Sequence, residues 1–88
     1  MEKLKDAIER IKILQCPTGD VENRVTGILE EYGVAGKKEI TVNRNEELDN
    51  IGAEAYSVQI GGNQGSIVVL ARSGMDDYVA EVVDVYMN

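Results

Sequence analysis

Carboxylates are the side chains of this sequence with the most potential for chemistry, and they are unevenly distributed. The 88 residues carry a formal net charge of −7 at pH 7. Residues 1–44 hold eight acids and eight bases, so the whole excess belongs to residues 45–88. That half has one base, Arg72, and eight acids: Glu46, Glu47, Asp49, Glu54, Asp76, Asp77, Glu81 and Asp84. Such an asymmetry favours a polar contact surface for a partner.

Other residue types that catalysis commonly needs are scarce. The chain has no histidine and a single cysteine, Cys16. It therefore has no Ser–His or Cys–His pair, and one chain cannot assemble a conventional zinc site. Two carboxylates can work as an acid–base pair when a shared pocket shifts their pKa values, but the sequence indicates no such pocket. We expect a protein without catalytic activity and without a cofactor.

The segment that begins at Asn43 has part of the pattern of a calcium-binding EF-hand loop. Positions 1, 3, 5, 7 and 12 of such a loop would be Asn43, Asn45, Glu47, Asp49 and Glu54. Position 6 is Leu48, where the sharp turn needs glycine, and the first position lacks its aspartate. We interpret the segment as a solvated acidic loop and expect no metal site.

Two further segments argue against phosphate and nucleic-acid binding. Residues 61–65 are rich in glycine, but they lack the Lys and Ser/Thr of a P-loop, so they predict a hairpin turn. Direct nucleic-acid binding usually needs a basic face, and this chain is acidic. The bases near the start of the chain are interleaved with acids, which is typical of a solvated mixed-charge face. These bases are Lys3, Lys5, Arg10 and Lys12.

Two amphipathic helices are predicted in the first part of the chain. In residues 2–15, apolar side chains recur at helical spacing, and Pro17 should end the helix. They are Leu4, Ile8, Ile11 and Leu14. Thr18 or Asp20 can cap a second helix over residues 20–32, and Gly33 is a natural C-cap. Its apolar stripe is Val21, Val25, Ile28, Leu29 and Tyr32.

Three strands follow in the sequence. Residues 39–43 and 56–60 alternate apolar with polar side chains, as strands with one buried face do. Residues 66–72 are apolar on both faces and predict a central strand. The glycine-rich segment should join the last two strands as a hairpin.

The segment 73–88 fits two structures. Its four valines favour a strand. A capping-box pattern at Ser73 favours a helix, and the apolar residues that follow recur at helical spacing. A helix would also place Asp77, Glu81 and Asp84 together on its polar face, whereas a strand would point Glu81 and Asp84 to opposite faces. We predict the helix, with a fourth strand as the alternative. The predicted fold is therefore a single α+β domain with two N-terminal helices, a three-stranded antiparallel sheet and a C-terminal helix.

The functional prediction is a non-catalytic acidic protein that occupies a basic surface on a partner protein through its eight C-terminal acids. Its most specific form is a phage-type accessory inhibitor of a nucleic-acid-binding enzyme that acts by charge mimicry. One alternative is that the charge serves solubility alone. Another is a small structural protein that forms a homo-oligomer through its sheet and C-terminal segment. No apolar run approaches the roughly 20 residues that cross a bilayer, and no signal peptide is evident, so we expect a cytoplasmic protein.

Overall fold

A computed structural model describes residues 2–50, 52–61, 65–73 and 78–87 of the chain. The regular elements are α1 (Glu2–Ile11), β1 (Gln15–Pro17), α2 (Val21–Glu31), β2 (Ile40–Arg44), β3 (Glu54–Ile60), β4 (Gly65–Ser73) and β5 (Val79–Met87). Three short 3-10 turns lie between them, namely η1 (Thr18–Asp20), η2 (Lys37–Glu39) and η3 (Glu46–Leu48). The five strands form one antiparallel sheet in the order β1-β5-β4-β3-β2.

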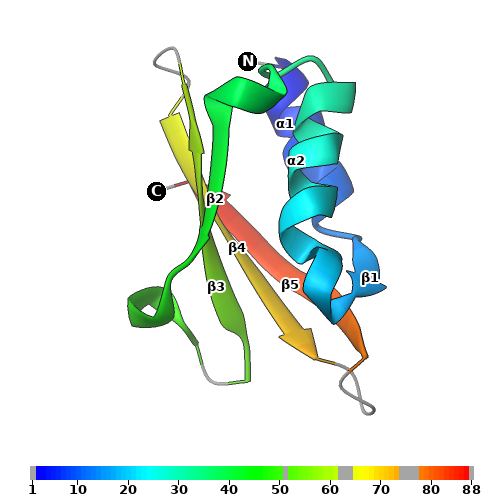
Figure 1. The fold of residues 1–88 in the computed structure, drawn as a ribbon, viewed down its shortest axis with the longest axis vertical. Coiled ribbons are helices and arrows are strands. Elements are labelled where there is room, and N and C mark those ends of the chain that lie inside the picture. Colours follow the sequence, from blue (N-terminus) through cyan, green and yellow to red (C-terminus); the bar gives the residue numbers. More distant parts are fainter. Residues whose placement is uncertain (1, 51, 62–64, 74–77, 88) are drawn as a thin grey trace.

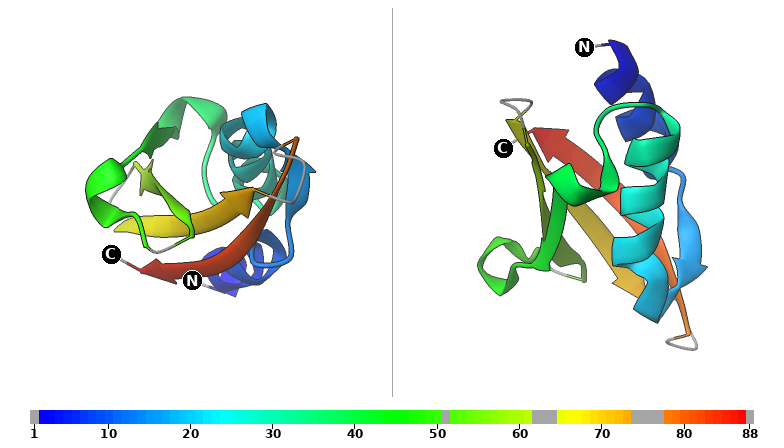
Figure 2. Two further views of the ribbon diagram at one scale, coloured as in Figure 1. Left: turned by 90° about the horizontal axis from the view of Figure 1, so that it is seen from below. Right: turned by 45° about the horizontal axis from the view of Figure 1, so that its top comes forward.

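The sheet separates the helices from η3. Both α-helices lie on one face of the sheet, and η3 projects from the opposite side (Figure 1). The sheet is strongly curled, as the views from other directions show (Figure 2). We refer to the face under α1 and α2 as the covered face and to the other as the open face.

The main core fills the space between the helices and the covered face. Its fully buried members come from both helices and from β3 and β4, because each element turns one apolar stripe inward. They include Ala7, Ile11, Val25, Leu29, Val58, Ile67 and Val69. A smaller cluster lies on the open face, where Ala55, Val68 and Leu70 are buried and Leu48 of η3 and Ala53 pack against them. This second cluster attaches η3 to the sheet.

The predicted C-terminal helix is wrong, because β5 is a strand and the sheet has five strands. The reason is a β-bulge. Asp84 pairs with Leu70, but the next residue of β4, Ala71, pairs with Val82, so β5 has one extra residue at this point. The bulge shifts the alternation, so Val82 and Val85 are both buried while Glu81 and Asp84 both lie on the open face. The objection to a strand therefore disappears, and the alternative reading of the segment as a strand is closer to the structure.

The first helix is also shorter than predicted. It ends at Ile11, and Gln15–Pro17 form the short edge strand β1, which pairs with residues 79–81 of β5. Pro17 explains part of this difference, because the residue before a proline prefers extended geometry. An edge strand also tolerates a proline, which cannot donate to a ladder. Leu14 remains buried, and its carbonyl accepts a 3.0 Å bond from the Val82 N–H.

Other predicted elements agree with the structure. Helix α2 has the predicted stripe and ends at Glu31, and Gly33 follows two residues later with a φ of 72°, which suits the predicted capping role. Asp20 occupies the N-cap position without a side-chain cap bond. The predicted hairpin joins β3 to β4, with Ile60 opposite Gly65, and residues 62–64 lie outside the described residues. The α-helices of the described chain have 10 and 11 residues, and neither is long and apolar enough to traverse a bilayer.

Candidate functional site

Six of the eight acids predicted to bind a partner lie in the described part of the chain. They are Glu46, Glu47, Asp49, Glu54, Glu81 and Asp84. Asp76 and Asp77 lie outside the described residues. The six divide into acids that an arginine of the same chain neutralises and acids with no such partner, and this division decides what the surface can bind.

Arg44 binds two of these acids. Its Nη1 and Nη2 donate to the two carboxylate oxygens of Asp49 at 2.6 and 2.8 Å, and its Nε lies 3.5 Å from Glu54. Nη1 also donates to the Ala55 carbonyl at 3.1 Å, and the guanidinium lies 5.8 Å from the centre of the Tyr56 ring. Arg44 is the last residue of β2, so its guanidinium group links the loop that contains η3 to the start of β3.

Asp49 is consequently a structural residue. Besides the two bonds from Arg44, its Oδ1 accepts the Ala55 N–H at 2.7 Å. The bonds from Arg44, and next that from the Ala55 N–H, hold the pKa of the Asp49 carboxyl below its ordinary value. Its carboxylate is thus fully occupied within the chain.

Glu81 is neutralised in a similar way. Arg72 of β4 donates from Nε to Glu81 Oε1 at 2.8 Å, and its Nη2 lies 2.7 Å from the same oxygen. Gln15 of β1 donates to the other oxygen at 3.2 Å. Arg72, and to a lesser extent Gln15, lower the pKa of the Glu81 carboxyl. Glu81 therefore ties together three neighbouring strands.

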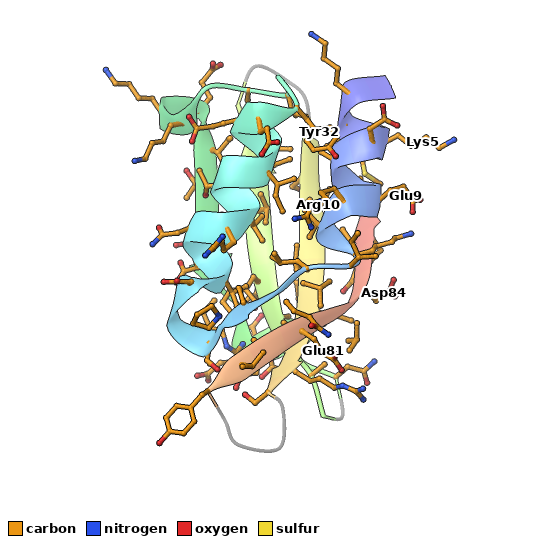
Figure 3. The ribbon with its side chains drawn as sticks, turned by 90° about the vertical axis from the view of Figure 1, so that its right-hand side faces the viewer. Lys5, Glu9, Arg10, Tyr32, Glu81 and Asp84 are labelled. Atoms are coloured by element: carbon orange, nitrogen blue, oxygen red, sulfur yellow. The ribbon has the colours of Figure 1, made fainter. Side chains whose placement is uncertain are left out.

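The remaining three acids, Glu46, Glu47 and Asp84, are exposed, and none forms an ion pair with another described residue. Glu46 and Glu47 lie on η3. Asp84 lies on β5, where its Oδ1 accepts the N–H of Val85 at 2.9 Å. Figure 3 shows the Asp84 side chain projecting outward from β5, on the same side of the molecule as Lys5 and Glu9 of α1.

The fold brings these unpaired acids to one face. Asp84 lies opposite Leu70 and Tyr86 lies opposite Val68. Side chains of directly opposed residues share a face of a sheet, so both β5 residues border the open-face cluster. Leu48 of η3 packs on that same cluster. Asp84 and the η3 turn that carries Glu46 and Glu47 thus lie on the open face, with the apolar side chains of the second cluster between them.

The described residues do not assemble a metal site or an enclosed acid pair. No group of three or more metal-ligating side chains is found among them. Asp49 and Glu54 are committed to Arg44, and the Asn45 side chain caps η3 through the Glu47 N–H and donates to Ser57. The EF-hand-like side chains therefore do not converge on a common point.

Three hollows, of about 400, 200 and 260 Å³, occur on the described surface, and each is lined by one carboxylate. That carboxylate is Glu39, Glu31 or Glu9, respectively. Cys16 is buried, and burial raises the pKa of its thiol. None of these groups has the geometry of an activated nucleophile or of a carboxylate dyad.

Two features of this surface were not predicted. Arg44 precedes the acidic half by one residue, so a count over residues 45–88 assigns it to the wrong group. Its position just before the acidic loop was the available signal. The second feature is the outer edge of β5, which could not be recognised while residues 73–88 were read as a helix.

No family model, curated protein or solved structure was found that matches this chain.

Proposed function

We propose that this protein is a non-catalytic binding protein whose open face contacts a basic surface on another protein. The observation that carries the proposal is the joint presence of three unpaired carboxylates and an exposed tyrosine on that face. The carboxylates are those of Glu46, Glu47 and Asp84, and the apolar contribution comes from Tyr86 of β5, with the exposed Val83 of the bulge in the same strand.

The unpaired acids are better candidates for partner contacts than the paired ones. A carboxylate that already holds an arginine must break that pair before it can bind a lysine or arginine of a partner. Glu46, Glu47 and Asp84 lose only solvent on binding, so their attraction to a cation is available in full. The proposal therefore concentrates on three of the eight acids predicted from the sequence.

The apolar side chains add a contribution that is independent of charge. Tyr86 keeps 39% of its surface exposed on this face, and Val83 in the same strand is 44% exposed. Tyrosine is enriched at protein interfaces because its ring is apolar and its hydroxyl can bond to polar groups. An apolar centre bordered by acids suits a protein surface with an apolar patch and a basic rim.

Charge mimicry of a nucleic acid stays a prediction within this proposal. Two arginines neutralise part of the acidic half, so the field of the described open face is weaker than the residue count indicates. A nucleic-acid-binding enzyme is one kind of protein that has a suitable basic surface, and inhibition of such an enzyme would be the consequence of occupying it.

A matched pair of triple variants tests the proposal. The open-face variant replaces Glu46 and Glu47 by Gln and Asp84 by Asn. The control replaces three exposed acids of α2, Glu22, Glu30 and Glu31, by Gln. Both variants remove three negative charges, so a general effect of net charge is the same in each.

Affinity for a lysine homopolymer, measured by titration calorimetry at low salt, is the readout. We expect about a tenfold loss of affinity, or about 1.4 kcal/mol, for the open-face variant and a much smaller loss for the control. Equal losses in the two variants would show that the chain binds through net charge alone and would refute the proposed surface.

A further inference from the structure

The outer edge of β5 is unpaired over its second half. Strand β1 pairs with β5 only at Val79–Glu81, and Val82 is bonded to Leu14 just beyond it. Within the described chain, no strand pairs with the outer side of residues 83–87. A free edge presents backbone N–H and C=O groups that can pair with another strand.

The backbone of Val85 is directed toward this free edge. Val85 lies opposite Val69 of β4, yet its N–H is bonded to the carboxylate of Asp84 instead. In an antiparallel sheet, a residue whose backbone N–H and C=O do not bond to the strand on one side directs both groups toward the opposite side. The Val85 N–H therefore faces outward, and by the two-residue period of a strand so does that of Met87.

Apolar side chains border the same edge on both faces. Tyr86 lies on the open face, Met87, which is 56% exposed, lies on the covered face, and Val83, the extra residue of the bulge, is 44% exposed. Met87 also lines a hollow of about 260 Å³ together with Leu4 and Ile8 of α1. Exposed apolar groups beside an unpaired strand edge are typical of an interface.

We propose that this edge binds a second copy of the chain, with β5 antiparallel to β5 of the partner subunit across a two-fold axis at Val85. The two sheets then become one continuous ten-stranded sheet. In this register Val85 exchanges both backbone bonds with Val85 of the partner subunit. Val83 lies opposite the partner's Met87, and Asp84 lies opposite the partner's Tyr86. The carboxylate of Asp84 protects the edge in the single chain and is displaced on pairing.

Charge complementarity favours a second copy as the occupant. The proposed register sets Asp84 opposite a tyrosine, so no like charges are directly opposed along the strands. On α1, Lys5 and Glu9 are exposed, are one helical turn apart and project to the same side as Asp84 (Figure 3). The two-fold axis places α1 antiparallel to its symmetry mate, so Lys5 faces Glu9 of the partner subunit and Glu9 faces the partner's Lys5.

The dimer also extends the open face. A two-fold axis perpendicular to the plane of the sheet, as antiparallel pairing of the two β5 strands requires, keeps the same face of both sheets on one side. The acids of η3 and β5 from both copies then share one surface. The dimer does not depend on the proposed function, but it would double the number of carboxylates that one partner could meet.

Sedimentation equilibrium over a wide concentration range tests this inference. A five-residue edge with one helix contact is small, so we expect a reversible dimer whose fraction rises with concentration. Met87→Pro removes one outward N–H while sparing the ladder to β4, and it should leave the protein monomeric at concentrations where the wild type dimerises. Backbone amide exchange at Val85 and Met87 should slow as the wild-type concentration rises.

A charge exchange on α1 provides a second test that leaves the strand untouched. Lys5→Glu and Glu9→Lys should each weaken the dimer several-fold, and the double variant should restore it because the pair is reversed. A strictly monomeric wild type, a dimer unaffected by Met87→Pro, or a double variant no better than either single variant would overturn the proposal. The proposed open face is tested separately by its charge-matched pair of variants, so a monomeric protein would not refute it, and equal losses in that pair would not refute the dimer.

Discussion

Arg44 and Asp49, five residues apart, form a two-pronged ion pair in which two guanidinium nitrogens reach the two carboxylate oxygens at 2.6 and 2.8 Å. Asp49 also accepts the backbone N–H of Ala55, so a single side chain connects the loop after β2 to the start of β3. The same carboxylate that adds to the acidic count of the sequence therefore helps to hold the fold.

The ion pairs Arg44–Asp49 and Arg72–Glu81 make the stability of the fold depend on pH in the acid range. The folded-state pKa values of Asp49 and Glu81 are lowered, so their contribution is present above the pKa values of the unfolded chain, about 4, and is lost as pH falls through the folded values. The urea concentration at the unfolding midpoint should therefore decrease as the pH is lowered below about 4. Asp49→Asn should reduce the midpoint at neutral pH and flatten this fall. Glu46→Gln, which removes an acid without an ion pair, serves as the control, and identical pH profiles for the two variants would contradict the assignment.

Gly27, inside α2, and Gly33, just beyond its C-terminus, should respond oppositely to replacement by alanine. A Cβ added at Gly27 meets no atom within 4 Å, so Gly27→Ala should stabilise the protein by about 1 kcal/mol through helix propensity. Gly33 has a φ of 72°, which strains any L side chain, so Gly33→Ala should destabilise by about 1 kcal/mol. Chemical denaturation measures both. Destabilisation by Gly27→Ala would mean that something outside the single chain packs on that helix face.

Burial predicts a wide difference between two aliphatic positions. Leu29 is fully buried between α2 and the sheet, whereas Ile13 is 72% exposed. Leu29→Ala should cost about 2–5 kcal/mol of unfolding free energy, a large part of the stability of a chain this short. Ile13→Ala should change it by less than about 0.5 kcal/mol. Similar costs at the two sites would show that α2 does not pack on the sheet as described.

The thiol of Cys16 should react slowly in the native protein. Cys16 is buried in the core, and burial raises the pKa of the thiol, so little thiolate is present at neutral pH. Alkylation by iodoacetamide, followed by mass spectrometry, should be much faster in denaturant than in native buffer. Equal alkylation rates in native buffer and in denaturant would show that the thiol is exposed and that β1 does not pack in the core.

The fold could be predicted from the sequence where apolar residues recur at a single spacing over the whole of a helix or strand. In α2 the apolar stripe recurs at helical spacing up to a glycine with positive φ, and in residues 56–60 of β3 the alternation is unbroken. Both signals are local, and both elements were found. Strand β5 was missed because its bulge inserts one residue between Val82 and Val85, so the apolar spacing matches a helix better than a flat strand.

The acidic surface was predictable only in part, for a different reason. Charge counts identify which residues are acidic, but they do not say which of them an arginine from another strand will reach. Glu81 meets Arg72 through the pairing of β4 with β5, and Asp49 meets Arg44 through the turn at η3. The Arg72–Glu81 contact depends on the register of β4 and β5, which the wrong assignment of the last segment concealed, and the Arg44–Asp49 contact depends on the turn geometry of η3.

The position of β5 in the sheet has a consequence for how the protein is made. The last strand of the described chain lies between β1 and β4, so Gln15 meets Glu81 across a sequence separation of 66 residues. A nascent chain on the ribosome can form α1, α2 and the β3–β4 hairpin early, but β1 has no strand to pair with until β5 has emerged. Folding of this sheet therefore waits until β5 has emerged, and a chain truncated before β5 would leave β1 without a strand to pair with and β4 with a neighbour on one side only.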